Sequence, residues 1–314
     1  MNKPLYRLSG KRIWVAGHRG MVGSALVRRL ALEDCEVITA GREEVNLLRQ
    51  KEVESWMDGV RPDAVFLAAA KVGGIHANDT LPAEFIYQNL MIETNVIHAA
   101  HQCDVEKLLF LGSSCIYPKM APQPMSEEAL LTGPLEPTNE WYAVAKIAGI
   151  KMCQAYQKQY GSNFISAMPT NLYGPGDNYD LQSSHVAAAL LVKAHRAKLA
   201  GEPEIEIWGT GTPKREFLHV DDLADGLVFL MKHYSDYDHI NVGSGDEVTI
   251  SELAAAIADA VGYTGTYRYN TDKPDGTPRK LMNNARIHAL GWQAQTKLKD
   301  GMVHAYDWYL KHNA

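Results

Sequence analysis

The sequence predicts an α/β fold in which a doubly wound parallel sheet is joined to a smaller carboxy-terminal lobe. Three observations support this fold class. Short apolar runs alternate with segments of helical periodicity up to about Pro169. A glycine-rich turn follows the first apolar run. Beyond Pro169, loops rich in Gly, Pro, Asn and Asp break the rhythm. Alternating strands and helices are typical of βαβ units, which build parallel sheets.

The first half of the chain contains five apolar runs of strand length, which are expected to be buried. Right-handed crossover helices between them would cover both faces of the sheet. The expected strands are 12–16, 36–40, 64–68, 107–111 and 164–168, and the expected helices are 21–32, 49–60, 85–101 and a segment from Tyr142 to about 160.

The second half has shorter elements separated by turns. We expect helices at 183–199, 221–233 and 250–261, a strand at 204–208 and a turn at 209–213. We therefore interpret residues 1–170 as a cofactor-binding domain and residues 171–314 as mainly a substrate-binding lobe, some segments of which return to the main sheet.

Composition excludes several classes of function. The chain has 314 residues, 46% of them hydrophobic, and a formal net charge of −6. That charge argues against nucleic-acid binding by general electrostatics. Cys35, Cys103, Cys115 and Cys153 form no Cys-x-x-Cys pair, which favours a reducing compartment. No apolar run is long enough to span a membrane, and the first six residues lack the core of a signal peptide. We expect a cytoplasmic protein without a membrane contact.

The turn after the first strand carries glycines at positions 17, 20 and 23. Such a strand–turn–helix arrangement directs backbone N–H groups and a helix dipole at a pyrophosphate, as in a Rossmann fold. An ordinary tight turn is the alternative, but the position near the amino terminus favours dinucleotide binding. The expected contacts are Gly17, His18, Arg19, Gly20, Met21, Val22 and Gly23.

The end of the second strand indicates which dinucleotide is bound. A site that prefers NAD usually has an acidic residue there, whereas the first charge here is Arg42. Together with Arg19 it would suit a 2′-phosphate, so the sequence predicts NADP(H). Alternatively, Arg42 is solvated and pairs with Glu43 or Glu44.

Tyr142 and Lys146 are one helical turn apart and should face the same side. An ammonium beside a phenol favours phenolate, so we expect a lowered pKa for Tyr142 and a role in proton transfer. The alternative is a half-buried tyrosine with a solvated lysine.

The segment that follows the fourth strand is expected to lie at the cleft, because the carboxyl ends of parallel strands meet there. Ser113 could hydrogen-bond a substrate oxygen or cap a turn. Cys115 could act as a base or be a buried small hydrophobe. His185 could be its acid partner or make a structural hydrogen bond. A nucleophile elbow is not expected, since no glycine follows the serine. No convincing set of metal ligands is present, and we expect no metal.

In the second lobe, basic residues and a tryptophan are expected near loops. Cations suit a sugar diphosphate, and an aromatic surface can stack on a base. Individually, each could be a surface residue. The group comprises Trp208, Lys214, Arg215, Arg279 and Lys280.

Taken together, these residues resemble those of the extended short-chain dehydrogenase/reductases that act on nucleotide sugars, and within them the GDP-4-keto-6-deoxy-D-mannose 3,5-epimerase/4-reductases. The resemblance covers nearly the whole chain from about Arg12. It rests on the segments AGHRGMVGS (16–24), AAAKVGGI (68–75), LGSSCIYP (111–118), PTNLYGP (169–175) and KPDGTPRK (273–280).

This resemblance implies roles for individual residues, a GDP-sugar substrate and a homodimer. Ser113, Tyr142 and Lys146 would form the reductase triad, with Cys115 as base and His185 as acid of epimerisation. The GDP-sugar would contact Lys193, Trp208, Arg215 and Asp275. Further cofactor contacts would be Leu111, Gly112, Ser114, Lys146, His185 and, at the nicotinamide end, Pro169, Thr170, Asn171 and Leu172.

Two other readings of the sequence remain. A nucleotide-sugar 4-epimerase or 4,6-dehydratase of the same superfamily would keep its cofactor and show no net redox change. The adjacent acidic residues of the dehydratases are absent after Ser113, where Cys115 stands. A non-enzymatic NADP-binding regulator would usually have an eroded triad, whereas the triad here is intact.

Overall fold

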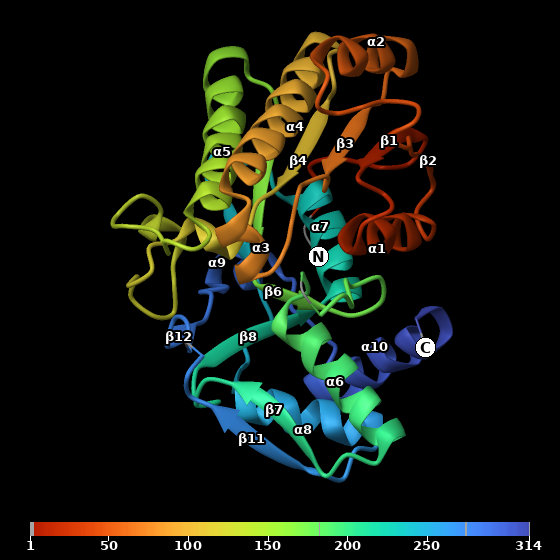
Figure 1. Ribbon diagram of the computed structural model, residues 1–314. Coiled ribbons are helices and arrows are strands. Elements are labelled where there is room, and N and C mark those ends of the chain that lie inside the picture. Colours follow the sequence, from red (N-terminus) through yellow and green to blue (C-terminus); the bar gives the residue numbers. More distant parts are fainter. Residues whose placement is uncertain (1–2, 182, 274, 314) are drawn as a thin grey trace.

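The computed structural model describes residues 3–181, 183–273 and 275–313. Its centre is a parallel six-stranded sheet with the order β2-β1-β3-β4-β5-β9 (Figure 1). The strands are β1 (Lys11–Ala16), β2 (Cys35–Ile38), β3 (Ala64–Leu67), β4 (Lys107–Leu111), β5 (Phe164–Pro169) and β9 (Ile240–Val242). The fold class expected from the sequence is therefore confirmed.

Helices cover both faces of this sheet because each strand alternates apolar side chains between two cores. One core packs beneath α1 (Met21–Leu30) and α7 (Val220–His233). The other packs beneath α2 (Gln50–Val60), α4 (Pro82–Gln102) and α5 (Glu140–Tyr160). Thus Val15 and Phe66 face the first core, whereas Trp14 and Val65 face the second.

The second lobe leaves the main sheet directly after β5 and has its own core (Figure 1). Its strands are β6 (Asn171–Tyr173), β7 (Glu204–Trp208), β8 (Lys214–His219), β10 (Glu247–Thr249), β11 (Thr266–Asn270) and β12 (Arg279–Lys280). Its helices are α6 (Val186–Ala200), α8 (Ile250–Val261) and α10 (Leu298–His312), while α9 (Ala285–Leu290) lies beside β9. Strand β9 and helix α7, both from beyond residue 170, belong to the main sheet and its covering layer.

Some expected boundaries agree with the structure and others do not. The strands at 107–111 and 204–208 and the helix at 250–261 have the predicted bounds. The helix expected from Ser183 begins at Val186, which leaves His185 as its N-cap. The segment around Lys214 and Arg215, expected near a loop, is the strand β8. Its central residue Glu216 is fully buried, so the strand lacks the apolar run by which strands are recognised.

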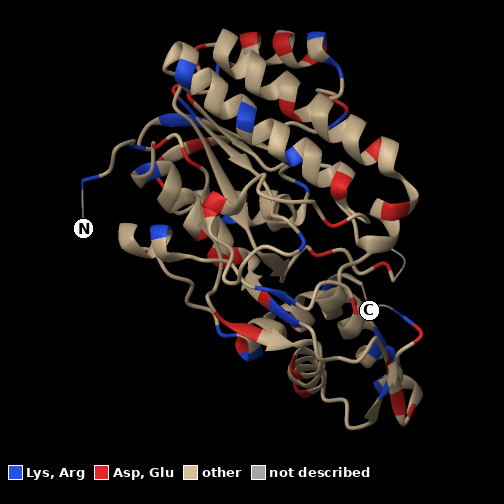
Figure 2. Ribbon diagram, turned by 90° about the vertical axis from the view of Figure 1, so that its left-hand side faces the viewer, with Lys and Arg blue, Asp and Glu red and all other residues tan. Residues whose placement is uncertain are grey.

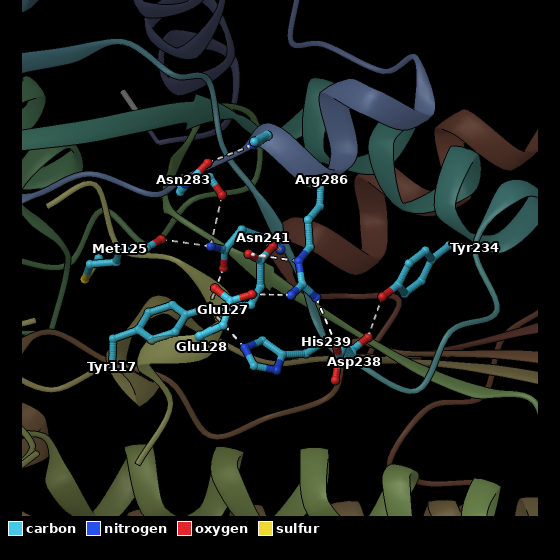
Figure 3. A network of polar contacts seen from close by, with 11 residues as sticks. Tyr117, Met125, Glu127, Glu128, Tyr234, Asp238, His239, Asn241, Asn283 and Arg286 are labelled. Atoms are coloured by element: carbon cyan, nitrogen blue, oxygen red, sulfur yellow. Dashed lines mark hydrogen bonds and ion pairs between the residues drawn. The ribbon is translucent and has the colours of Figure 1, made fainter. Parts of the chain in front are cut away.

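A buried polar network joins the loop after β4 to β9 and to the segment before α9 (Figure 3). Asn241 on β9 accepts a hydrogen bond from the Tyr117 hydroxyl at 2.5 Å and donates to the Met125 carbonyl at 3.0 Å. Its backbone N–H donates to Glu127 at 3.0 Å, and Arg286 lies 3.5 Å from the same carboxylate. Because every polar group here has a partner, the network fixes three segments that are distant in sequence.

Basic and acidic residues are interspersed along the helices (Figure 2). None of the helices in the described ranges is both long enough and apolar enough to cross a bilayer.

Candidate active site

The glycine turn between β1 and α1 is formed by very close backbone packing. Gly17 has a φ of +90°, and a Cβ there would lie 2.7 Å from the Cα of Ala69. At Gly23 a Cβ would lie only 2.0 Å from the carbonyl oxygen of Gly17. Any side chain at these two positions would push the turn open. The glycines are therefore needed for the geometry of the turn itself.

This turn suits a pyrophosphate. Helix α1 begins at Met21, and its N-cap, Gly20, supplies no side-chain oxygen to the first turn. The first turn contains no acidic residue, whereas Arg28 and Arg29 lie in the last turn. Free backbone N–H groups and the positive end of the helix dipole thus remain available for an anion.

The two arginines near the end of β2 differ in their partners. Arg19 forms an ion pair with Glu43, and both side chains are largely exposed. Arg42 is exposed and has no ion-pair partner in the described part of the chain. The pairing considered for Arg42 is therefore made by Arg19 instead. The Arg42 guanidinium is available to a phosphate.

Helix α5 brings Tyr142 and Lys146 to the carboxyl end of β4, as the spacing predicts. The Lys146 ammonium lies 5.9 Å from the centre of the Tyr142 ring. It donates to the carbonyl of Leu111 at 3.1 Å and pairs with the Glu93 carboxylate at 2.9 Å. The side chains of Lys146 and Glu93 are only 2% and 1% exposed, so this lysine is not solvated.

The expected lowering of the Tyr142 pKa is wrong for this structure. Burial raises the pKa of Tyr142, with further increases from the negative charges of Cys115 and Glu93, while a hydrogen bond with Ser113 opposes them. Burial is the main cause, and the Glu93 carboxylate beside Lys146 adds a negative charge that disfavours phenolate. Tyr142 therefore carries its proton at neutral pH and is ready to donate it.

Ser113 and Cys115 stand on the tight turn after β4. Ser113 caps the short helix η1 (Ser114–Ile116), and its hydroxyl accepts the N–H of Cys115 at 3.3 Å. The Cys115 thiol is half-exposed and accepts hydrogen bonds from Asn139 Nδ2 at 3.5 Å and from Lys280 Nζ at 3.7 Å. The sulfur is thus a polar group of the cleft and not a small hydrophobe of the core.

The side chain of His185 is exposed and lies near Lys280, the lysine that contacts the Cys115 sulfur. Burial by the surrounding atoms lowers its pKa, and the charge of Lys280 lowers it further. The loop before α3 (Ile75–Thr80) holds the segment before His185, since Gly74 N–H donates to the Ser183 carbonyl at 2.9 Å. A Cβ on Gly74 would lie 2.6 Å from the Ser184 carbonyl, so the two segments touch.

The residues at the end of β5 surround the start of the second lobe. Pro169 is the last residue of β5, and the N–H of Thr170 donates to the Val242 carbonyl at 3.1 Å. The side chain of Asn171 donates to the Glu216 carbonyl at 2.8 Å, which ties β6 to β8. The expected nicotinamide segment 169–172 thus lies where the main sheet and the lobe meet.

In the second lobe the four predicted substrate contacts form two adjacent pairs. Lys193 Nζ lies 5.5 Å from the centre of the exposed Trp208 ring. Asp275 accepts the N–H of Thr210 at 2.6 Å, two residues after Trp208. Burial lowers the pKa of Arg215, and the charge of Asp275 partly offsets this effect.

A line of side chains connects the thiol with this lobe. Lys280, beside the Cys115 sulfur, pairs in register with Arg215 across β12 and β8. Arg215 lies near Asp275. Asp275 in turn accepts the N–H of Thr210, which is two residues after Trp208. The line suits an extended ligand with a diphosphate near its middle. A separate open depression lies near Arg286 and Leu290, and none of the predicted site residues lines it.

Two residues of this arrangement were not predicted to have these positions. Glu93 reaches Lys146 from the buried face of α4, which it shares with Phe85 and Asn89. Lys280 was expected near a diphosphate but contacts the Cys115 sulfur. An acidic residue on an apolar helix face was the available signal for Glu93, because such residues are seldom buried without a partner. The contact of Lys280 depends on long-range folding and had no local signal.

Within the described ranges no cluster of three or more His, Cys, Asp or Glu side chains is arranged to hold a metal ion.

Comparison with known proteins identifies the class to which this fold and site belong. Residues 13–243 match the model of the NAD dependent epimerase/dehydratase family. The chain belongs to this family.

Individual proteins are similar to this chain over nearly its whole length. A GDP-L-fucose synthase of Sinorhizobium fredii is 61% identical over 99% of both chains. Among solved structures, a GDP-6-OMe-4-keto-L-xylo-heptose reductase from C. jejuni has a TM-score of 0.91 at 38% identity and covers 97% of this chain and 99% of its own. A GDP-L-fucose synthetase from Naegleria fowleri bound to NADP has a TM-score of 0.90 at 26% identity, with coverages of 99% and 97%.

Proposed function

We infer that this protein is an NADP(H)-dependent enzyme that epimerises GDP-4-keto-6-deoxy-D-mannose at C3 and C5 and reduces C4 to give GDP-L-fucose. The single observation that carries this inference is a chain of neighbours: Tyr142 lies near Ser113 and Cys115, and Lys280 lies near both Cys115 and His185. Tyr142, Ser113 and Lys146 suit reduction of a ketone, and Cys115 and His185 suit proton transfer at its neighbouring carbons. The similarity to GDP-L-fucose synthases over nearly the full chain supports the substrate.

Binding would use both lobes. The glycine turn and Arg42 would hold the pyrophosphate and 2′-phosphate of NADP(H), which supplies the hydride for C4 when bound. Arg215 would hold the diphosphate of the GDP-sugar, with Lys193 and Trp208 toward the nucleoside. The hexose would then lie between Cys115 and His185.

Epimerisation would begin at a proton made acidic by the C4 ketone. Cys115 removes the proton, and Lys280 compensates the charge of the thiolate that does so. Tyr142 and Ser113 stabilise the enolate oxygen by hydrogen bonds. His185 returns a proton to the opposite face of the carbon. Proton exchange with solvent then restores the Cys115 thiolate and the protonated His185, and the same sequence inverts the second carbon.

Reduction would follow on the inverted ketone. Tyr142 would donate its proton to the C4 oxygen, and the bound cofactor would supply the hydride that makes the ketone an alcohol. The raised pKa of Tyr142 keeps that proton in place at neutral pH. Lys146 then balances the phenolate that remains, until solvent restores the proton.

The test is an assay of the purified protein with NADPH and GDP-4-keto-6-deoxymannose, with the UDP and dTDP ketosugars as controls. We expect steady loss of NADPH absorbance with the GDP-sugar and an L-fucose product. A 4-epimerase or 4,6-dehydratase would interconvert sugars without consuming NADPH. Binding of NADPH without any turnover would favour the regulator, and a reduced D-sugar would leave reduction alone as the activity.

Arg42 gives a prediction for cofactor choice. In Arg42→Ser we expect about 10- to 100-fold weaker binding of NADPH and little change for NADH, because a charge-assisted bond to the 2′-phosphate is lost. Fluorescence titration of both cofactors measures this, with the exposed Arg196→Ser in the other lobe as the matched control. Equal weakening of both cofactors would argue against a 2′-phosphate contact.

We also propose a homodimer that forms through α4 and α5. These helices lie side by side at one side of the molecule (Figure 1) and expose apolar residues that have no cover: Tyr87, Trp141 and Val144 are 58%, 43% and 41% exposed. We expect Val144→Arg to yield monomers in analytical ultracentrifugation, whereas Leu199→Arg, an exposed residue at the end of α6, leaves the dimer intact. A monomeric unmodified protein would rule out this interface.

We also propose a cytoplasmic location. All four cysteines are free thiols in the structure, and the proposed reaction needs Cys115 reduced.

A further inference from the structure

The buried carboxylate of Glu93 has only one polar partner. Its carboxylate lies 2.9 Å from Lys146 Nζ, and neither oxygen accepts another hydrogen bond within the described structure. A buried carboxylate normally requires several donors, and a buried ion pair is often no more stable than apolar residues of the same shape. Stability therefore gives no sufficient reason for an acid at this position.

The packing around the pair leaves the ammonium little freedom. The Leu111 carbonyl at the end of β4 accepts from Lys146 Nζ at 3.1 Å, and the Phe110 ring centre is 4.7 Å away. Gly149 on α5 lets this helix approach α4 closely, because a Cβ at this position would lie only 2.9 Å from the Glu93 carboxylate. Lys146 is thus held from α4, β4 and its own helix at once.

The same helix also supports the cofactor turn. One turn before Glu93, the Asn89 side chain accepts the N–H of Lys71 at 2.9 Å and donates to the Lys71 carbonyl at 3.0 Å. Lys71 belongs to the loop after β3, whose first residues touch Gly17. The buried face of α4 therefore supports two parts of the proposed site.

We propose that Glu93 is a positioning residue: its carboxylate fixes the Lys146 ammonium at the base of the cleft and places a negative charge beside the Lys146–Tyr142 pair. The proposal rests on the proposed function for what that pair does, but the charge relation can be tested without turnover. The titratable groups near the Glu93 carboxylate are Tyr142, Lys146 and Cys153, all on α5. Cys115 on η1 lies near Tyr142.

The direction of the effect follows from charge. Burial raises the pKa of Glu93, while the attraction of Lys146 lowers it, and Glu93 in turn raises the pKa of Tyr142. Replacing the carboxylate by an amide removes a negative charge from beside two groups that hold protons. Whichever of the two responds more, the pair must release a proton at lower pH.

The first experiment needs no substrate. Glu93→Gln is compared with the unmodified protein by phenolate absorbance, with Tyr142→Phe as the blank, and by the ¹⁵N resonance of Lys146 Nζ, assigned by its loss in Lys146→Arg. We expect at least one of these titrations to move about one pH unit or more to lower pH. If neither moves, the proposal is wrong.

The second experiment follows the pH dependence of NADPH consumption. The alkaline limb of kcat should appear at lower pH in Glu93→Gln, whereas a merely structural role would lower kcat at every pH alike. Glu93→Asp keeps the charge on a shorter side chain, farther from Lys146, so the alkaline limb of kcat should move less in this variant. If Glu93→Gln does not fold, an unmoved limb in Glu93→Asp overturns the proposal.

Two controls separate the possible failures. Glu84→Gln, on the exposed side of the same helix and paired with Lys71, should leave the alkaline limb in place. If the unmodified protein fails to consume NADPH with the GDP-ketosugar, the proposed function has failed, while the substrate-free titrations still decide the role of Glu93.

Discussion

Substitution of Tyr142 by Phe is expected to lower the rate of NADPH oxidation by about 10²- to 10⁴-fold, the usual contribution of a general acid. The variant loses only the hydroxyl that we propose as the proton donor to the C4 oxygen. The ring, with its edge-on contact with Phe85, and the Lys146–Glu93 pair would remain, so the fold and NADPH affinity should be nearly unchanged.

The measurement is single-turnover loss of NADPH absorbance at saturating ketosugar. Tyr156→Phe is the matched control, because it removes a hydroxyl from the same helix that bonds His98, away from the cleft. Exchange at C3 and C5 should continue in Tyr142→Phe at a reduced rate, since Ser113 still supports the enolate. Unchanged NADPH consumption would remove Tyr142 from its proposed role.

Substitution of Cys115 by Ser is expected to lower proton exchange at C3 and C5 by about 10²- to 10⁴-fold. A serine hydroxyl ionises far less readily than a thiol, so the variant lacks a base although it keeps the shape of the side chain. The hydrogen bonds from Asn139 and Lys280 can still be made to oxygen, which should preserve the local structure.

Incorporation of solvent deuterium, followed by NMR, measures this exchange separately from reduction. Cys35→Ser, a half-buried thiol on β2, is the control and should exchange normally. NADPH binding should be unaffected in both variants. Full exchange at both carbons in Cys115→Ser would mean that another group is the base.

Local sequence was informative wherever a short segment determines its own geometry. The glycines at 17 and 23 predict the turn because backbone atoms lie within 2.0 to 2.7 Å of where a Cβ would be. The spacing of Tyr142 and Lys146 predicts a shared face because a helix repeats every 3.6 residues. Apolar runs such as 107–111 predict buried strands because both faces of a parallel sheet are covered.

The misjudged features depend on contacts between distant segments. The strand β8 was missed because Glu216 is polar, yet it is stabilised in the interior by N–H groups of Gly245 and Met282. The direction of the Tyr142 pKa was misjudged mainly because Tyr142 is buried by the packing of distant segments. In addition, Glu93 on α4, 53 positions before Lys146, places a negative charge nearby.

The sequence by itself determined the parallel α/β fold, the glycine turn and the chemical types of the groups in the candidate site, because these follow from periodicity, glycine spacing and side-chain chemistry. Only the tertiary structure decided the electrostatic state of those groups. Burial and the charges of Glu93 and Lys280 act through space over a few ångströms, and the folding of α4 and β12 against the cleft brings them there.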